Sequence, residues 1–220
     1  MSTLSIIFED NHLVLFNKPA GLLTQPTSLE NESLETLGKD WIKNTKNKPG
    51  NVFLHAVHRL DMPASGLVLF AKTSKALSRL SQQMRDRLCK KTYLACIDRT
   101  MPAMEGHLEN YLVHDHHRAL VLEQKEGEGK WSRLEYRVIN QKRGISLLEI
   151  SLITGRYHQI RAQLSHIGCP VIGDLKYASN RILGQNCIAL HHSRLEFTHP
   201  VQNTHIMFEA PLPDYWPLKS

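Results

Sequence analysis

Short strand-like segments recur along this 220-residue chain, and they do not alternate regularly with helices. Runs in which Leu, Ile and Val alternate with polar residues predict strands, and apolar residues at helical spacing predict helices. Many strands with a few short helices favour an α+β fold over a doubly wound parallel sheet. The expected strands cover residues 5–8, 12–17, 67–70, 92–98, 108–113, 132–140, 146–153, 189–197 and 206–210, and the expected helices cover 33–44, 74–88 and 157–167.

Turn and cap residues divide these elements. Lys18-Pro19-Ala20-Gly21 predicts a turn after the second strand, and Gly106 predicts a turn before the strand at 108–113. Ser74 is the expected N-cap of the helix at 74–88, and Gly168 is the expected C-cap of the helix at 157–167. The charged, glycine-rich residues 123–130 indicate an exposed hairpin loop.

Composition excludes several classes of protein. No repeat, low-complexity linker or domain boundary is evident, so we expect a single domain over residues 1–220. No apolar run approaches the ~20 residues of a membrane helix, and the N-terminus lacks the features of a signal or transit peptide. The four cysteines form no C-x-x-C pair and predict reduced thiols in a cytoplasmic protein without membrane attachment.

The positive charge has a local concentration. The net charge of +6 favours a polyanionic partner, and seven basic residues against one acid lie between Lys72 and Lys91. This stretch has two interpretations, a solvated helix face or an edge that contacts phosphates.

A lone carboxylate stands out in the stretch from His55 to Thr73. Asp61 follows Arg59 by two residues and precedes a Pro-Ala-Ser-Gly turn into an apolar run. Aspartates often cap turns, which is the simplest explanation. A carboxylate on a stiff loop at the end of a strand is also suited to catalysis.

Two further stretches carry chemistry. Thr154 to Arg161 combines a glycine turn, two arginines and a His-Gln pair at a helix start, which suits an anion or a structural salt bridge. Tyr93 follows a basic edge into a strand, where a tyrosine packs in a core or stacks on a nucleobase.

Metal and cofactor motifs are missing from the sequence. The histidine clusters at 114–117 and 191–192 do not have zinc-ligand spacing, and no H-E-x-x-H is present. The sequence also lacks a Gly-rich phosphate loop, a nucleophile elbow and a dinucleotide fingerprint. We therefore expect neither a metal nor a cofactor.

Taken in order, these stretches resemble the RluA family of pseudouridine synthases. His58-Arg59-Leu60-Asp61, followed by Ser65-Gly66-Leu67, is similar to the family signature H-R-L-D-x-x-T-S-G-L. Ala64 stands where the family has threonine, and Met62-Pro63 replaces a pair that is commonly polar. The other matching blocks are Asn17 to Gly21, Lys91 to Ala95, Gly155 to Arg161, Gly168 to Tyr177 and Phe197 to Pro200.

The resemblance implies a fold and a reaction. The pseudouridine synthase fold has a central, mixed but mostly antiparallel sheet flanked by short helices and loops, with the active-site cleft across the sheet. Such enzymes isomerise uridine to pseudouridine within RNA without metal or cofactor, breaking the C1′–N1 bond, rotating the base and rejoining it at C5. The chain is similar to the form without the small N-terminal S4 domain, so we expect the catalytic domain itself to recognise the target.

The resemblance also implies roles for site residues. Asp61 is the expected nucleophile, or alternatively the base that opens the sugar, and Arg59 is expected to fill the space of the flipped-out uridine. Tyr93 is expected to stack on the target base, and Arg161 to pair with Asp61 while Ile160 packs the pocket. The remaining substrate-binding residues expected from these motifs are His58, Arg156, His158 and Gln159.

The expected partner is RNA, either ribosomal RNA or transfer RNA, bound by a monomer. A catalytically silent RNA-binding protein on the same fold is the main alternative, motivated by Ala64. A metal-dependent phosphoesterase using the histidine clusters is a weaker one.

Overall fold

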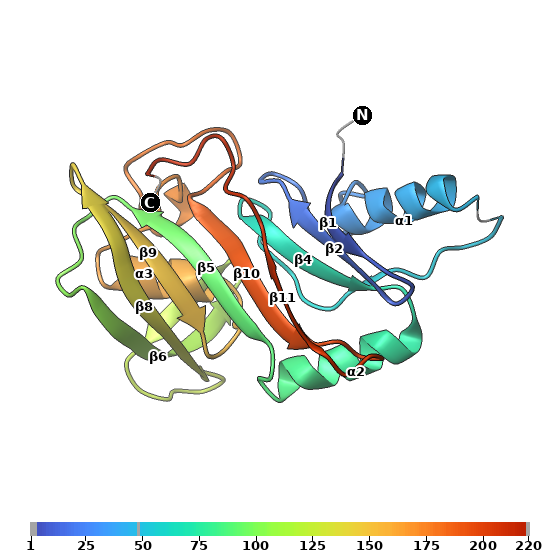
Figure 1. Ribbon diagram of the computed structural model, residues 1–220. Coiled ribbons are helices and arrows are strands. Elements are labelled where there is room, and N and C mark those ends of the chain that lie inside the picture. The colour runs from blue at the N-terminus through green and yellow to red at the C-terminus, as the bar shows by residue number, and fades with distance from the viewer. Residues whose placement is uncertain (1–3, 48, 219–220) are drawn as a thin grey trace. The chain divides into compact units, whose positions relative to one another are not determined.

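The computed structural model describes residues 4–47 and 49–218, which form two compact units. The first unit comprises Met1–Cys89 and Ser193–Leu212, and the second comprises Lys90–His192 and Pro213–Ser220. Each unit has its own strands and helices (Figure 1). The expectation of a single domain over the whole chain stays a prediction.

Antiparallel strands form the framework of the first unit. β1 (Ser5–Glu9) pairs with β2 (Leu13–Lys18), and β2 pairs with β4 (Ser65–Ala71). The two-residue strand β3 (His55–Ala56) also pairs with β4, and β11 (His205–Glu209) pairs with β10. β10 (Leu190–Thr198) begins in the second unit and belongs to the first from Ser193 onward.

Helices cover both faces of the β2–β4 pair. Side chains alternate between the two faces of a strand, and Leu13, Leu15, Leu67 and Leu69 belong to one buried cluster. Helix α2 (Ser74–Arg85) adds Ala76 and Leu80 to this cluster.

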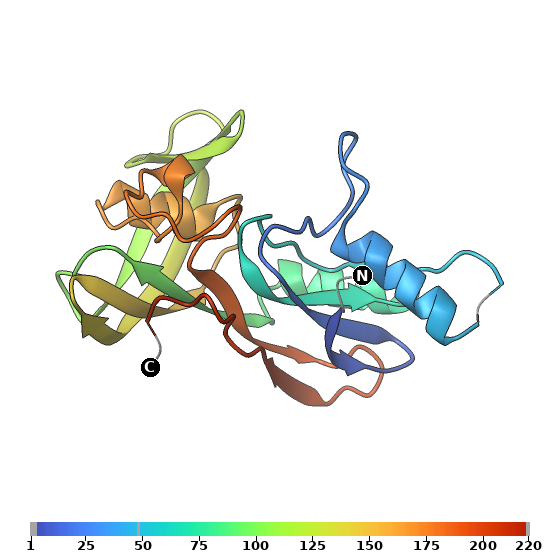
Figure 2. The same ribbon diagram turned by 90° about the horizontal axis from the view of Figure 1, so that it is seen from above.

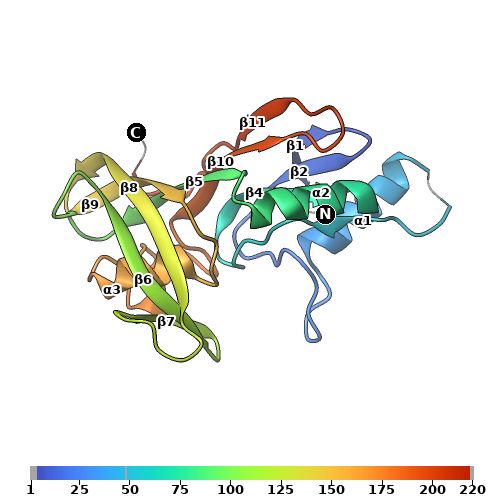
Figure 3. The ribbon, with the colours of Figure 1, turned by 90° about the horizontal axis from the view of Figure 1, so that it is seen from below.

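On the other face, Phe16 of β2 contacts Phe70 of β4 and Trp41 of helix α1 (Leu34–Thr45), each with an edge-to-face ring contact. Helix α1 lies in front of the strands in the view from above (Figure 2), and α2 lies in front in the view from below (Figure 3). Because both faces are covered, every residue of β4 is buried, which explains its continuous apolar sequence.

The second unit is built on the strand order β5-β9-β8-β6-β7, with antiparallel pairing throughout this series. The bounds are Lys90–Ile97 for β5, Glu105–Asp115 for β6, Arg118–Leu122 for β7, Lys130–Lys142 for β8 and Ile145–Leu152 for β9. Helix α3 (Gln159–His166) packs on β6 and β7 through Ala162, and a short 3-10 helix, Leu175–Tyr177, follows it.

Several local expectations are confirmed and others are wrong. The nine expected strands and three expected helices are all present, with shifts at their ends. Gly106 lies inside β6 and not in a turn. Its lack of a side chain makes room for Tyr136 of the neighbouring strand, which lies over it. The five-residue strand β7 was not expected.

The helix ends differ in detail. Thr73, not Ser74, caps α2: its Oγ1 accepts a hydrogen bond from the amide of Ala76 at 3.2 Å. Helix α2 ends at Arg85, which leaves Leu88 outside the helix and exposed. In α3 the C-cap is Ile167, and Gly168 follows it with a φ of 74°, the left-handed conformation that ends many helices.

The α+β fold class and the mostly antiparallel sheet are confirmed. The strand pairings given above are antiparallel, while an isolated bridge between Leu23 and Ser33 is parallel. Among the helices of the described residues, none has both the length and the apolar character required to cross a bilayer.

Candidate functional site

The loop of Asp61 connects β3 and β4 in the first unit. Asp61 is half-buried, and its carbonyl oxygen accepts a hydrogen bond from the amide of Ala64 at 3.1 Å, which closes a tight turn. Arg59 is exposed on the same loop. His58 lies beside β4, where its Nε2 accepts a hydrogen bond from the amide of Leu69 at 3.2 Å.

Thr24 anchors the loop one residue before Asp61. Its hydroxyl donates to the carbonyl oxygen of Leu60 at 3.0 Å and accepts from the amide of Leu60 at 3.1 Å. Both Thr24 and Leu60 are buried. A single side chain therefore satisfies the donor and the acceptor of one loop residue, which would otherwise lack partners away from water.

Lys18 anchors the loop one residue after Asp61. Its ammonium group donates to the carbonyl oxygens of Pro19, Leu22 and Met62 at 2.8, 2.7 and 3.1 Å, so all three protons have acceptors. The amide of Gly21 donates to the same carbonyl of Met62 at 2.9 Å. The turn after β2 is thus fastened to the Asp61 loop by backbone oxygens.

The charge of Lys18 is fully buried. Burial lowers the pKa of Lys18 to about 7, although the nearby charge of Asp61 acts in the opposite direction. Lys18 and Asp61 are therefore electrostatically coupled within the first unit.

Tyr93 and His192 form a stacked pair in the second unit. The ring centroids are 4.6 Å apart and the planes differ by 15°. Both residues are buried, and Tyr93 lies on β5 while His192 lies at the start of β10. The tyrosine expected to meet a base therefore has one ring face packed on a histidine.

Arg161 of α3 forms a buried bidentate ion pair with Asp174. Its Nε and Nη2 donate to the two carboxylate oxygens at 2.6 and 2.9 Å. The guanidinium also lies over the ring of Tyr177, 5.0 Å from its centroid. The Tyr177 hydroxyl in turn lies 2.9 Å from Nδ1 of His158, so these four residues form one connected network.

The other residues expected at the start of α3 make structural contacts. His158 occupies the N-cap with a φ of 52° and is buried. The Oε1 of Gln159 accepts from the amide of Arg156 at 3.0 Å and from the hydroxyl of Thr154 at 2.8 Å. Ile160 is buried, whereas Arg156 is exposed and donates from Nε to the carbonyl oxygen of Trp131.

The expected site residues fall into two groups. His58, Arg59 and Asp61 share one loop of the first unit, while Tyr93, Arg156 and the residues from His158 to Arg161 belong to the second. The expected pairing of Arg161 with Asp61 stays a prediction.

Sequence reasoning missed the anchors Thr24 and Lys18 and the partners Asp174 and His192. Lys18 and Asp174 do lie in segments that match the family motifs, and this match was the available indication that they matter.

The basic stretch from Lys72 to Lys91 is not uniform. Lys72 forms an ion pair with Glu9 at 2.6 Å, and Arg79 donates to the carbonyl oxygen of Pro200. Lys90 and Lys91 belong to the second unit and the earlier residues to the first. The interpretation as one phosphate-contacting edge stays a prediction.

Among the described residues, no group of three or more His, Cys, Asp or Glu side chains is arranged to hold a metal ion. The thiols of Cys89, Cys96 and Cys169 are buried and that of Cys187 is half-buried, all unpaired with one another. Burial raises the pKa of Cys96 to about 12, which keeps it a neutral thiol.

Known proteins share this sequence and this fold. The family model for RNA pseudouridylate synthase matches residues 12–166. An uncharacterized RNA pseudouridine synthase of Bacillus subtilis is 34% identical over 212 residues, covering 96% of this chain and 69% of the relative. The ribosomal large subunit pseudouridine synthase D of Zymomonas mobilis is 32% identical over 225 residues, with 96% and 69% covered.

A solved structure, human RNA pseudouridylate synthase domain containing 4, superimposes with a TM-score of 0.80 at 21% identity and covers 96% of this chain and 90% of its own. That likeness shows that the fold is shared, whereas the family model and the relatives show that the sequence is similar. Together with the matching signature around Asp61, they show that the chain belongs to the RNA pseudouridylate synthases, a family of RNA-modifying isomerases.

Proposed function

We propose that this isomerase acts on uridine in ribosomal RNA, with Asp61 as its catalytic carboxylate. Several relatives are named ribosomal large subunit pseudouridine synthases, of types D and C, which favours ribosomal RNA over transfer RNA. The protein works as a cytoplasmic monomer in this proposal.

The observation that carries the proposal is the double anchoring of the Asp61 loop. Thr24 holds the residue before Asp61 and Lys18 holds the residue after it. A reacting carboxylate must keep its position relative to the ribose, and a misplacement of about 1 Å can cost a hundredfold in rate. The anchors provide this positioning from strand β2 and the turn that follows it.

Arg59 and Tyr93 act on the target nucleotide in this proposal. Arg59 is exposed beside Asp61, so its guanidinium is available to replace an extruded base in the RNA stack. Extrusion costs a few kcal/mol, which contacts to the emptied stack and to phosphates offset. Tyr93 packs on the extruded uracil, and Arg161 supplies positive charge to the site.

The decisive experiment replaces Asp61 by Asn, which preserves shape and removes the negative charge. Bulk ribosomal and transfer RNA from cells lacking the protein are incubated with each variant, and pseudouridine is measured by mass spectrometry. We expect no conversion by Asp61→Asn, unchanged RNA affinity, and full conversion by the control Asp40→Asn, an exposed carboxylate of the same unit. Conversion by Asp61→Asn at the normal rate would refute the catalytic role.

The alternative of a silent RNA-binding protein makes a different forecast. It is motivated by Ala64, which replaces the usual threonine and is buried beside Asp61 in the loop. In that case the unchanged protein binds RNA but converts no uridine in either RNA class. Conversion of any single uridine by the unchanged protein excludes this alternative.

A further inference from the structure

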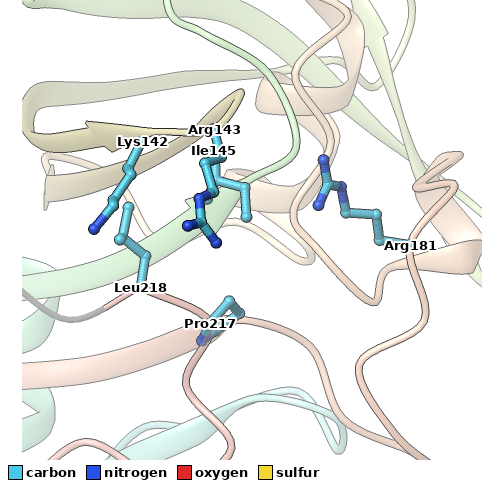
Figure 4. Close-up of a pocket in the computed structure, with 6 residues that line it drawn as sticks. All are labelled: Lys142, Arg143, Ile145, Arg181, Pro217 and Leu218. Carbon is cyan, nitrogen blue, oxygen red and sulfur yellow. The ribbon is translucent and has the colours of Figure 1, made fainter.

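A pocket in the second unit lies at the turn between β8 and β9, away in sequence from every expected catalytic residue. Its volume is about 400 Å³, within the roughly 300–1,000 Å³ of small-ligand sites. It is lined by Lys142, Arg143, Ile145, Arg181, Pro217 and Leu218 (Figure 4).

The described side chains that line this pocket carry only positive charge. Lys142, Arg143 and Arg181 are exposed, and none of the lining residues that the structure describes has a carboxylate. Within residues 4–47 and 49–218, none of these three side chains forms an ion pair. By contrast, Arg133, Arg137 and Arg194, which lie on strands, are each paired with a glutamate.

The two arginines line the same pocket. Figure 4 shows Arg143 and Arg181 extending toward a common open space, one from the hairpin tip and the other from the loop that follows the 3-10 helix. In the same view the ammonium group of Lys142 points away from the two arginines. Guanidinium groups bind phosphate oxygens through paired hydrogen bonds, so phosphate is the anion that this arrangement suits.

The rest of the wall is apolar. Ile145, Pro217 and Leu218 are half-buried and lie beside the arginines. A pocket for a bare inorganic ion needs no such wall, whereas a sugar or base next to a phosphate buries apolar surface against it. Bases also stack on guanidinium planes.

The backbone at Arg143 supports a binding role. Arg143 and Gly144 have φ values of 54° and 74°, which form the two-residue turn between β8 and β9. Asn or Gly is the ordinary residue at the first of these positions, because a longer side chain is strained there. Strained residues are concentrated at ligand sites, where the side chain is needed for contact.

We propose that this pocket binds one phosphate of the RNA, with its adjoining nucleoside, as a second anchor for the substrate. The proposal rests on the proposed function for the identity of the polymer, but the site itself involves no residue of the Asp61 loop. RNA is preferred to a free nucleotide because the protein already acts on RNA, and both share the phosphate and nucleoside chemistry.

The first test removes the two arginine charges in the double variant Arg143→Asn, Arg181→Gln. We expect its affinity for a ribosomal RNA fragment to fall about tenfold at 0.1 M salt. The slope of log affinity against log salt should decrease in magnitude by about 1, because one phosphate contact is lost. The conversion rate at saturating RNA should stay within twofold.

A matched control removes two unpaired charges elsewhere in the same unit, Arg118→Gln with Lys125→Gln. We expect less than a twofold change in affinity and an unchanged salt slope. Equal losses in the two double variants would attribute the effect to overall charge and overturn the proposal, as would full affinity in the pocket variant.

Folding is controlled by Arg143→Asn alone. Because Asn accepts the left-handed conformation better than Arg, this variant should melt at or above the temperature of the unchanged protein while it binds RNA several-fold more weakly. A variant that melts higher and binds RNA normally would show that Arg143 has no part in binding.

The nucleoside contact is tested with uridine 5′-monophosphate and inorganic phosphate, observed by NMR shifts of the pocket residues. Leu218→Asn should weaken the nucleotide at least threefold and leave inorganic phosphate unchanged. If uridine 5′-monophosphate binds equally to Leu218→Asn and to the unchanged protein, the nucleoside contact is overturned. If the nucleotide binds the pocket but the Arg143→Asn, Arg181→Gln variant keeps full affinity for RNA, the assignment of RNA to this pocket is overturned.

The binding measurements are repeated in the Asp61→Asn background. A defect of the pocket then appears as lost affinity in a protein that is already inactive. Failure of the catalytic proposal, in contrast, appears as conversion by Asp61→Asn with the pocket intact, so the two results are distinguishable.

Discussion

Asp174 holds Arg161 by two hydrogen bonds, at 2.6 and 2.9 Å, with the arginine side chain 4% and the aspartate side chain 1% exposed. The pair links α3 to the segment just before the 3-10 helix, 13 residues later. A guanidinium this deeply buried depends on a carboxylate, because an unpaired charge in the interior is costly.

Asp174→Asn should therefore destabilise the protein by about 3–5 kcal/mol, since it removes the negative charge that receives two hydrogen bonds from the buried Arg161 guanidinium. Urea denaturation measures the change. The matched control is Glu149→Gln, which breaks the more exposed pair of Arg137 and Glu149 in the same unit and should cost under about 1 kcal/mol. Comparable losses of unfolding free energy in both variants would contradict the idea that burial makes the Arg161–Asp174 pair more costly to break.

Lys18 should give the stability a particular pH dependence. Its pKa is about 7 in the folded protein and about 10.4 in the unfolded chain, so between these values the unfolded chain binds the extra proton. The unfolding free energy should then rise with pH from 7 to 10, by at most about 1.4 kcal/mol per pH unit. Below pH 7 both states are protonated and this contribution is flat.

Lys18→Met is the variant that isolates this effect. It removes the titrating group and should abolish the rise of the unfolding free energy between pH 7 and 10. It also lowers stability overall, because the carbonyl oxygens of Pro19 and Leu22 lose their donor and that of Met62 keeps only the amide of Gly21. Parallel curves for the two proteins between pH 7 and 10 would show that Lys18 titrates near its ordinary pKa.

Thr24→Val should impair catalysis more than stability. Valine has the same shape but offers the amide and carbonyl of Leu60 no partner, which costs about 1–3 kcal/mol of stability. Because the Asp61 loop loses one anchor, kcat should fall at least tenfold while KM changes little. Thr45→Val, which removes an exposed hydroxyl hydrogen bond to Trp41 within α1, is the control and should leave kcat unchanged.

Gly173→Ala and Gly168→Ala should differ in cost although both glycines have positive φ, 87° and 74°. A Cβ on Gly173 would lie 2.6 Å from the carbonyl oxygen of Cys187, whereas one on Gly168 meets nothing within 4 Å. We expect about 1 kcal/mol for Gly168→Ala, from the backbone conformation alone, and at least about 3 kcal/mol for Gly173→Ala. Thermal melting of both variants provides the comparison.

The sequence predicted those parts of the fold that depend on local pattern. β8 and β9 have alternating apolar residues, and the apolar residues of α1 recur at helical spacing, so both kinds of element are visible in the sequence. β7 is short and owes its conformation to pairing with β6, which no local pattern reveals. Gly106 shows the same limit, because the residue over it comes from another strand.

The candidate site was predictable in its loop but not in its supports. The turn around Asp61 is encoded by its own Pro-Ala-Ser-Gly sequence, whereas Thr24 and Lys18 lie 36 and 44 residues before their partners Leu60 and Met62. Both anchors bind backbone atoms, which every residue has, so no particular residue type at their partner positions reveals these contacts in the sequence. The contacts of Arg161 were only partly foreseen, since its partner Asp174 was known only as part of a matching block.

Anchoring through backbone atoms makes the fastening of the Asp61 loop independent of the side chains at the two anchored positions. Within the loop, Lys18 binds the carbonyl oxygen of Met62, and Thr24 binds the amide and carbonyl of Leu60. Every residue has a backbone carbonyl, so the acceptor that Lys18 uses is present whichever side chain follows Asp61.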